Sequence, residues 1–329
     1  MPESQLSDEV LEEILAYCMT IPPDVFLQFP TEARDSPHEY LAQSRLDYLC
    51  VSKRWLRVAR PLLYTSVVLF KNAHTKSVAA VLAGHSGVGR RMRTLRLEGG
   101  YGRDFALIAA AAPRIEHLYL NLEVASSDTI AGLRKSLTTL NPTTFRAHQL
   151  GLLGIKHGNQ TVLELRAIME ACISSRWTNL THIFLSESFP MSMSMAKCLV
   201  KAEKLEELHI ATADALKWLS AEVDPAIPLA TVLHNRTLQI VRCRGIADKE
   251  AVYSCLAVIP TLPPAMPLVM FVPKPGEPDE FGGYAPNPLE VATQQLVAQA
   301  PAPAIATAFN VRAMPQHQGY DSSGSHYRW

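Results

Sequence analysis

The sequence lacks an excess of charge of either sign, because 31 Lys and Arg residues stand against 31 Asp and Glu residues in a chain of 329 residues. That balance excludes a disordered polyelectrolyte and gives no reason to expect a nucleic-acid partner. The six cysteines include no C-x-x-C pair, which argues against a disulfide scaffold and against the usual zinc spacing. With 48% apolar residues, the chain has the composition of a globular protein with a sizeable core.

Segments typical of secretion or of membrane insertion are also missing. The first residues lack the basic region and apolar stretch of a secretory signal, so we expect an intracellular protein, cytoplasmic or nuclear. Residues 251–273 carry no charge and are long enough to cross a bilayer, but internal prolines oppose a continuous helix there. We interpret this region as a closing strand, Ala251–Ile259, a Pro-rich turn, and an apolar strand, Leu268–Val272.

The charges that are present are unevenly distributed. Residues 1–40 carry nine acids and one base, whereas residues 41–104 carry twelve bases and three acids. We expect the two segments to attract each other or to present opposite fields to partners. Proline is concentrated near the C-terminus. Three parts are therefore predicted: a helical domain at residues 1–70, a strand–helix domain at residues 71–272, and a Pro-rich, disordered tail at residues 273–329.

The first of these parts begins with a capped amphipathic helix. Ser7 is placed to cap it, and acidic residues follow at the positive end of the helix dipole. Apolar residues recur at helical spacing and form one stripe, which consists of Val10, Leu11, Ile14, Leu15 and Cys18. Pro22-Pro23 is expected to end this region and residues 19–40 to form a loop. A later helix is expected to be capped by Ser52 and ended by Pro61.

Three segments follow one another in this order: Leu6-Ser-Asp-Glu-Val-Leu11 with Ile14, then Tyr48-Leu-Cys-Val-Ser-Lys-Arg-Trp55, then Ala59-Arg-Pro-Leu-Leu-Tyr64. Together they resemble an F-box, the adaptor-binding module of cullin-RING ubiquitin ligases, in the form common in large fungal protein sets. The resemblance covers about the first seventy residues, with a long insertion and with Ser7 where proline is usual. It implies a Skp-type adaptor as partner, bound by Leu6, Ser7, Val10, Leu11, Ile14, Val51 and Trp55.

The residues alone leave an ordinary helical hairpin, packed on the rest of the chain, as the alternative. Three short helices bury little surface by themselves, since domains of about 60 residues are marginally stable. We therefore predict that the apolar stripe of the first helix stays uncovered and receives a partner.

A second pattern begins near residue 92 and places apolar residues at positions i, i+3 and i+5. Six copies have their central apolar residue at Leu95, Leu118, Phe145, Ile183, Leu208 and Val241. Helix-like segments lie between the copies, so each unit is predicted to be a strand followed by a helix. This arrangement resembles the divergent leucine-rich-repeat-like regions that follow F-boxes in many fungal proteins. It predicts an α/β fold with an irregular solenoid of parallel strands, and a doubly wound α/β domain is the alternative.

Strand alternation predicts an exposed row of residues that point away from the helices. The row is rich in Arg, His, Tyr and Phe, which suit protein recognition, although a merely solvated sheet face is the simpler interpretation of any one residue. We predict that the target-binding face includes Arg96, Tyr119, Arg146, Phe184, His209 and Arg242. The histidines of the row come from different units and do not converge as metal ligands must, so no metal or cofactor is predicted.

Residues 84–89, Gly-His-Ser-Gly-Val-Gly, are similar to the nucleophile elbow of serine hydrolases, but Val88 replaces the second required glycine. The F-box resemblance implies a non-catalytic substrate-recognition subunit of an SCF-type ubiquitin ligase. Its predicted partners are a Skp-type adaptor and an unknown target protein, with no membrane. Two alternatives remain: a protein-interaction scaffold with a degenerate F-box, and an α/β hydrolase-like enzyme with Ser86 as nucleophile.

Overall fold

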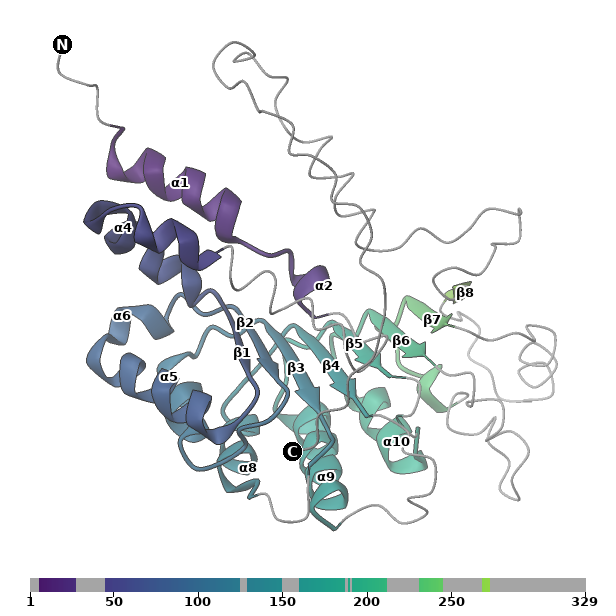
Figure 1. Cartoon of the computed structure of the whole chain (residues 1–329). Coiled ribbons are helices and arrows are strands. Elements are labelled where there is room, and N and C mark those ends of the chain that lie inside the picture. Colours follow the sequence, from purple (N-terminus) through teal and green to yellow (C-terminus); the bar gives the residue numbers. More distant parts are fainter. Residues whose placement is uncertain are drawn as a thin grey trace, which may run out of the picture. The chain divides into compact units, whose positions relative to one another are not determined.

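A computed structural model describes residues 6–27, 45–124, 129–149, 160–186, 189, 191–211 and 231–244, and the backbone of 268–272 (Figure 1). The chain divides into two compact units, residues 1–286 and 287–329, and every described residue belongs to the first. The predicted strand Ala251–Ile259, the predicted tail at residues 273–329 and most of the predicted loop at residues 19–40 lie outside the described residues.

A parallel sheet of eight strands forms the centre of the described chain. Its strands are β1 (Ser66–Leu69), β2 (Thr94–Leu97), β3 (His117–Asn121), β4 (Thr144–His148), β5 (His182–Leu185), β6 (Glu207–Ala211), β7 (Ile240–Arg244) and β8 (Leu268–Val272). They are hydrogen-bonded in the order in which they occur in the sequence. A doubly wound sheet reverses its strand order at a switch point. The eight described strands show no reversal, so the doubly wound alternative is wrong.

Helices follow the strands and cover one face of the sheet (Figure 1). They are α5 (Asn72–Gly84), α6 (Ser86–Gly89), α7 (Phe105–Ala111), α8 (Ala131–Leu137), α9 (Gln160–Ser175) and α10 (Met193–Lys201). Because every crossover advances in the same direction along the sheet, right-handed connections place these helices on the same side. Strand residues such as Leu95 and Leu118 pack there with helix residues such as Ile108 and Leu133, in one continuous sheet core.

The same hydrogen-bond pair recurs at the six junctions between successive strands from β1 to β7. The carbonyl of the residue before a strand accepts two backbone N–H groups, from the residue before the next strand and from that strand's first residue. The accepting residues are Thr65, Arg93, Glu116, Thr143, Thr181 and Glu206. The units are therefore geometrically equivalent at these junctions, although the sequence between them varies in length.

The N-terminal part of the described chain is a small helical unit, called the head below. It contains α1 (Asp8–Met19), a 3-10 turn η1 (Tyr48–Cys50) and α4 (Lys53–Leu63). Buried side chains of α1 pack on Ala59 of α4 and form a head core that is separate from the sheet core. Pro61 lies inside α4, so the prediction that it ends this helix is wrong. A proline near a helix end removes one hydrogen bond, but the two residues after it still adopt helical geometry here.

Two further elements differ from the expected organisation. Strand β1 precedes the predicted boundary at residue 70, yet it pairs with β2, so the sheet begins within the predicted first domain. A short helix, α2 (Pro23–Phe26), forms at the start of the expected loop. It packs on Val68 and Tyr119, and thus on the outer face of the sheet, which is the face opposite α5–α10.

Candidate protein-interaction surfaces

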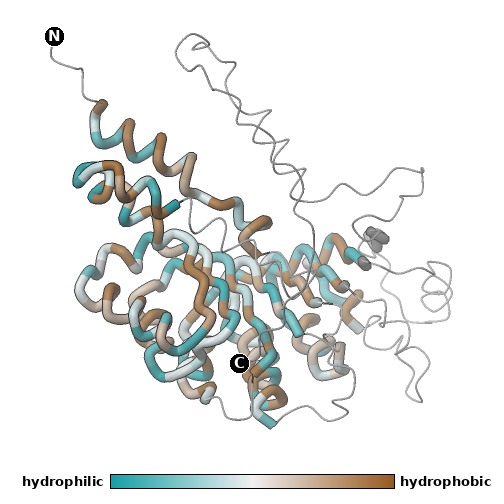
Figure 2. The backbone as a smooth tube through the Cα atoms, in the orientation of Figure 1, coloured by the Kyte–Doolittle hydropathy of each residue, from teal (hydrophilic) through white to brown (hydrophobic). Residues whose placement is uncertain are grey.

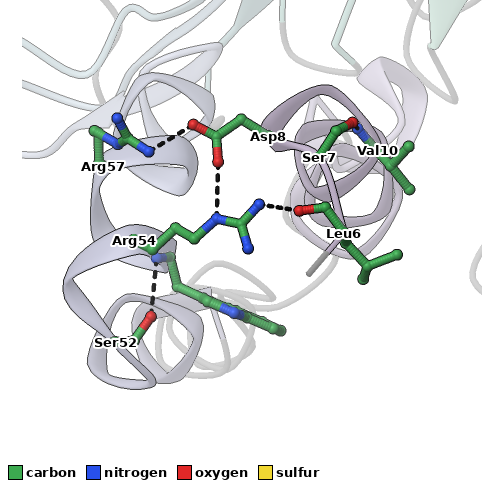
Figure 3. Close-up of polar contacts among 8 residues, drawn as sticks. Leu6, Ser7, Asp8, Val10, Ser52, Arg54 and Arg57 are labelled. Atoms are coloured by element: carbon green, nitrogen blue, oxygen red, sulfur yellow. Dashed lines mark hydrogen bonds and ion pairs between the residues drawn. The ribbon is translucent and has the colours of Figure 1, made fainter. Parts of the chain in front are cut away.

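Serine caps fix the starts of both long helices of the head. The Ser7 hydroxyl accepts a hydrogen bond from the Val10 amide at 3.4 Å, and the Ser52 hydroxyl accepts one from the Trp55 amide at 3.2 Å (Figure 3). Each cap satisfies one of the amides that a helix leaves without an intrahelical acceptor. Ser7 therefore starts α1 as a cap.

Asp8 joins the two capped ends. Its carboxylate accepts a hydrogen bond from Nε of Arg54 at 2.8 Å and forms an ion pair with Arg57 at 2.5 Å (Figure 3). Arg54 also donates to the carbonyl of Leu6. The hydrogen bond from Arg54 is the main cause that lowers the pKa of Asp8 below its usual value of 3.8. The start of α1 is thus held against the start of α4.

The expected attraction between the acidic and basic segments is confirmed by these contacts. A third ion pair, between Glu12 and Arg91 at 2.5 Å, connects α1 to the turn before β2. All three acid–base contacts join residues 1–40 to residues 41–104. They lie at the surface, so each contributes little to stability, and their main effect is to orient α1.

The apolar side chains of α1 point to two different sides of the helix. Leu11 and Leu15 are buried in the head core, and Leu11 is only 3% exposed. The prediction that Leu11 lies on the adaptor-binding surface is therefore wrong. Successive helical residues are rotated by about 100°, so Val10 and Leu11 point to different sides, and α4 covers the side of Leu11. Trp55 is half-buried, with its ring stacked on Tyr48 at a centroid separation of 6.4 Å.

The other side of α1 and its surroundings form an exposed apolar head surface. Its large side chains are between 42% and 59% exposed: Leu6, Val10, Ile14, Tyr17, Leu46, Val51 and Leu56. Figure 2 shows hydrophobic and hydrophilic residues alternating along α1. The sequence prediction included Leu6, Val10, Ile14 and Val51. It missed Tyr17, whose position three residues after Ile14 was the available signal, and Leu46 and Leu56.

On the outer face of the sheet, the six predicted target-binding residues lie side by side. Successive strands pair Arg96, Tyr119, Arg146, Phe184, His209 and Arg242 in register, and we call this set the stacked row. The guanidinium carbon of Arg96 lies 3.9 Å from the ring centre of Tyr119, and that of Arg146 lies 3.9 Å from the ring centre of Phe184. The rings of Phe184 and His209 stack at 3.9 Å.

Half of the stacked row is covered, which corrects the expectation of an exposed row. Arg96, Tyr119 and Arg146 are at most 7% exposed. The cover is the segment Ile21–Leu27, called the docked segment below, whose apolar side chains cluster with Tyr119. Local strand alternation assigned these side chains to the correct face, but it could not show that a segment distant in sequence lies over that face.

Main-chain carbonyls attach the docked segment to the row. Arg96 donates to the carbonyl of Phe26 at 3.0 Å, and Arg146 donates to the carbonyl of Leu27 at 3.4 Å. The sequence analysis placed these residues in a loop. The apolar pair Phe26-Leu27 directly after a Pro-Pro-containing stretch was the signal that they pack against something.

The second half of the row remains partly accessible. Phe184, His209 and Arg242 are half-buried. Glu207 lies two residues before His209 on β6. It forms an ion pair with Arg242, and its Oε1 lies 3.0 Å from Nε2 of His209. Burial lowers the pKa of His209 to about 4, so this histidine is neutral at physiological pH. This half of the row therefore presents ring edges, an imidazole and a guanidinium.

Ser86 lies in a setting that differs from a nucleophile elbow. It begins α6 and follows α5, with only His85 between the two helices. A nucleophile elbow requires a strand before the serine, so the hydrolase alternative loses the geometry that it predicted. Within the described ranges, no group of three or more His, Cys, Asp or Glu residues is placed to hold a metal ion. None of the described helices combines the length and apolar character needed to cross a membrane.

Comparison with known proteins adds no assignment. No protein-family model matches this chain, and no curated protein matches it either.

Proposed function

We propose that this chain is a substrate-recognition subunit of a cullin-RING, SCF-type ubiquitin ligase. An F-box-like head binds a Skp-type adaptor, and a leucine-rich-repeat-like solenoid holds a target protein on its outer face. The observation that carries the proposal is the apolar head surface, where seven large apolar side chains stay exposed on a unit whose own core is already filled.

The division of α1 supports a protein partner for this surface. One side of the helix is filled by α4, and the opposite side presents Val10, Ile14 and Tyr17 to solvent. A contiguous apolar patch of this kind marks an interaction site, and an amphipathic helix with spaced anchors suits a groove or helix of a partner. Burying the exposed part of each side chain would contribute about 1 kcal/mol.

The repeated junctions support the second part of the proposal. Units that share the same pair of junction hydrogen bonds and pair in chain order bury their apolar faces against their neighbours only, as in a solenoid. Such an array leaves a long outer face for recognition. In this role the chain forms and breaks no bonds, and it contributes by holding the target near the subunits that transfer ubiquitin.

Binding to a purified Skp-type adaptor tests the first part directly. The wild-type chain should bind, and Val10→Asp plus Ile14→Asp should weaken binding at least 100-fold, because two buried carboxylates would be left without partners. Leu11 is unsuitable for this test because its substitution would disturb the head core.

The matched control places the same charges on exposed apolar residues elsewhere. Leu107→Asp plus Leu163→Asp alters two exposed leucines of α7 and α9 and should leave adaptor binding unchanged. A wild-type chain that unfolds cooperatively but fails to bind the adaptor would reject the ligase role and favour the interaction scaffold.

A further inference from the structure

The outer face of the sheet is chemically unlike the sheet core, although part of it is just as deeply buried. Beneath α5–α10 the strands contribute apolar, uncharged side chains. Beneath the docked segment they contribute Arg96, Tyr119 and Arg146. Burying a guanidinium is unfavourable unless acceptors meet it, and a face that served only as core would be more stable with aliphatic residues.

The carboxylate of Glu98, directly after β2, forms an ion pair with Arg96, and the backbone of the docked segment provides further acceptors for both arginines. Arg96 and Arg146 hold two consecutive carbonyls, those of Phe26 and Leu27. Between these hydrogen bonds, the side chains of the docked segment lie on Tyr119. This is how a groove binds a short peptide: main-chain groups provide the hydrogen bonds, and apolar side chains provide the anchor.

The docked segment belongs to neither of the two cores. Ile21, Phe26 and Leu27 form a third cluster with Tyr119, separate from the head core and from the sheet core. Undocking the segment would therefore remove no side chain from either core. The row under it continues in register to Phe184, His209 and Arg242, so the covered and open halves form one surface.

We infer that the docked segment is an intramolecular ligand of the stacked row, and that the target binds there as a peptide of the same chemistry and displaces it. Such a peptide offers two consecutive main-chain carbonyls to the arginines and an aromatic–aliphatic side-chain pair to Tyr119. The inference rests on the proposed role of the outer face in target binding, and it identifies the class of target segment.

The probe is the docked segment itself as a labelled, end-blocked peptide, Ile-Pro-Pro-Asp-Val-Phe-Leu, added to the full chain. In a vacated variant, Phe26→Ser plus Leu27→Ser, the row is open, and the peptide should bind with a dissociation constant of about 100 µM or lower. This follows because a short tether gives an effective concentration of about 1 mM, and docking in the intact chain requires a dissociation constant well below that. The wild-type chain should bind at least tenfold more weakly.

Two controls assign the binding to the row. Adding Arg146→Gln to the vacated variant should weaken binding at least tenfold, because one carbonyl loses its donor. A peptide with Ser at its last two positions should not bind. Absence of binding to the vacated variant, or loss of its cooperative thermal unfolding, would overturn the inference, because the segment would then be a permanent part of the fold.

A measurement on the unaltered chain gives an independent answer. Millimolar peptide should speed hydrogen exchange in Ile21–Leu27 and leave exchange in β3 unchanged. No acceleration would overturn the inference. In the proposed function the adaptor binds the apolar head surface, which the head core supports. The vacated variant retains both, so failure of the peptide experiment and failure of the ligase assignment are distinguishable.

Discussion

The head and the outer face of the sheet both present side chains beyond their own cores, but with opposite chemistry. The apolar head surface consists mainly of Leu, Val and Ile, whereas the stacked row consists of arginine, histidine and aromatic rings. An aliphatic surface is stabilised by any well-fitting cover, and a folded partner can cover all of it. Guanidinium groups and rings offer directional contacts, which select a particular segment. The two surfaces are therefore suited to different kinds of partner.

The largest change in the free energy of unfolding is expected from substitutions on the buried side of α1. Leu15→Ala should lower the free energy of unfolding of the head by about 2–5 kcal/mol, because it leaves a cavity against α4. Ile14→Ala, on the exposed side, should cost less than about 1 kcal/mol. Hydrogen exchange of the α1 amides measures both values. Equal costs would show that both sides are covered, and the apolar head surface would then not exist.

A smaller effect is expected in the pH dependence of stability, which should differ between the head and the sheet. Burial lowers the pKa of His148 and of His209 from 6.5 to about 4, so the unfolded chain takes up protons before the folded chain does. The stability of the sheet should fall as the pH drops from about 6.5 to about 4, by about 1–2 kcal/mol per histidine at pH 5.

Urea unfolding at pH 7 and pH 5 measures this loss. The variant His148→Gln plus His209→Gln should show a flatter dependence on pH. Residues 6–27 and 45–64 contain no histidine, so α1 exchange should change little over the same range. A sheet whose stability does not change between these two pH values would contradict the burial of both rings.

The smallest effect concerns the orientation of α1. The hydrogen bond from Arg54 lowers the pKa of Asp8, so its contribution is present above the unfolded value of 3.8 and is lost as the pH falls through the folded value. Asp8→Asn should reduce the melting temperature slightly at neutral pH and have no effect in strong acid. Glu13→Gln on the same helix is the matched control. A difference from wild type that persists in acid would point to a role of Asp8 other than its charge.

Strand positions could be predicted from the sequence because their signal is local. The recurring apolar pattern placed Leu95, Leu118 and Ile183 at the centres of strands, and they lie in the sheet core. The two-residue period also assigned Arg96 and Tyr119 to the outer face. The predicted helical domain at residues 1–70 includes β1, and the membership of β1 in the sheet was not predicted, since pairing with β2 is a tertiary contact.

The environment of these residues could not be predicted, because it depends on distant parts of the chain. Arg96 and Arg146 lie 70 and 119 positions from the carbonyls that they hold. In α1, helical spacing grouped Val10 with Leu11 in one broad stripe. Only the position of α4 shows that the stripe has two sides, one packed within the chain and one exposed.

The order of the strands also bears on how such a chain can change over time. Each described strand pairs only with the strands that precede and follow it in the described sheet, and the six junctions from β1 to β7 repeat the same two hydrogen bonds. Duplication or deletion of one strand–helix unit would change the strand pairing at a single junction and leave every other pairing intact. The outer surface can thus lengthen or shorten by whole strand–helix units while the head stays unchanged.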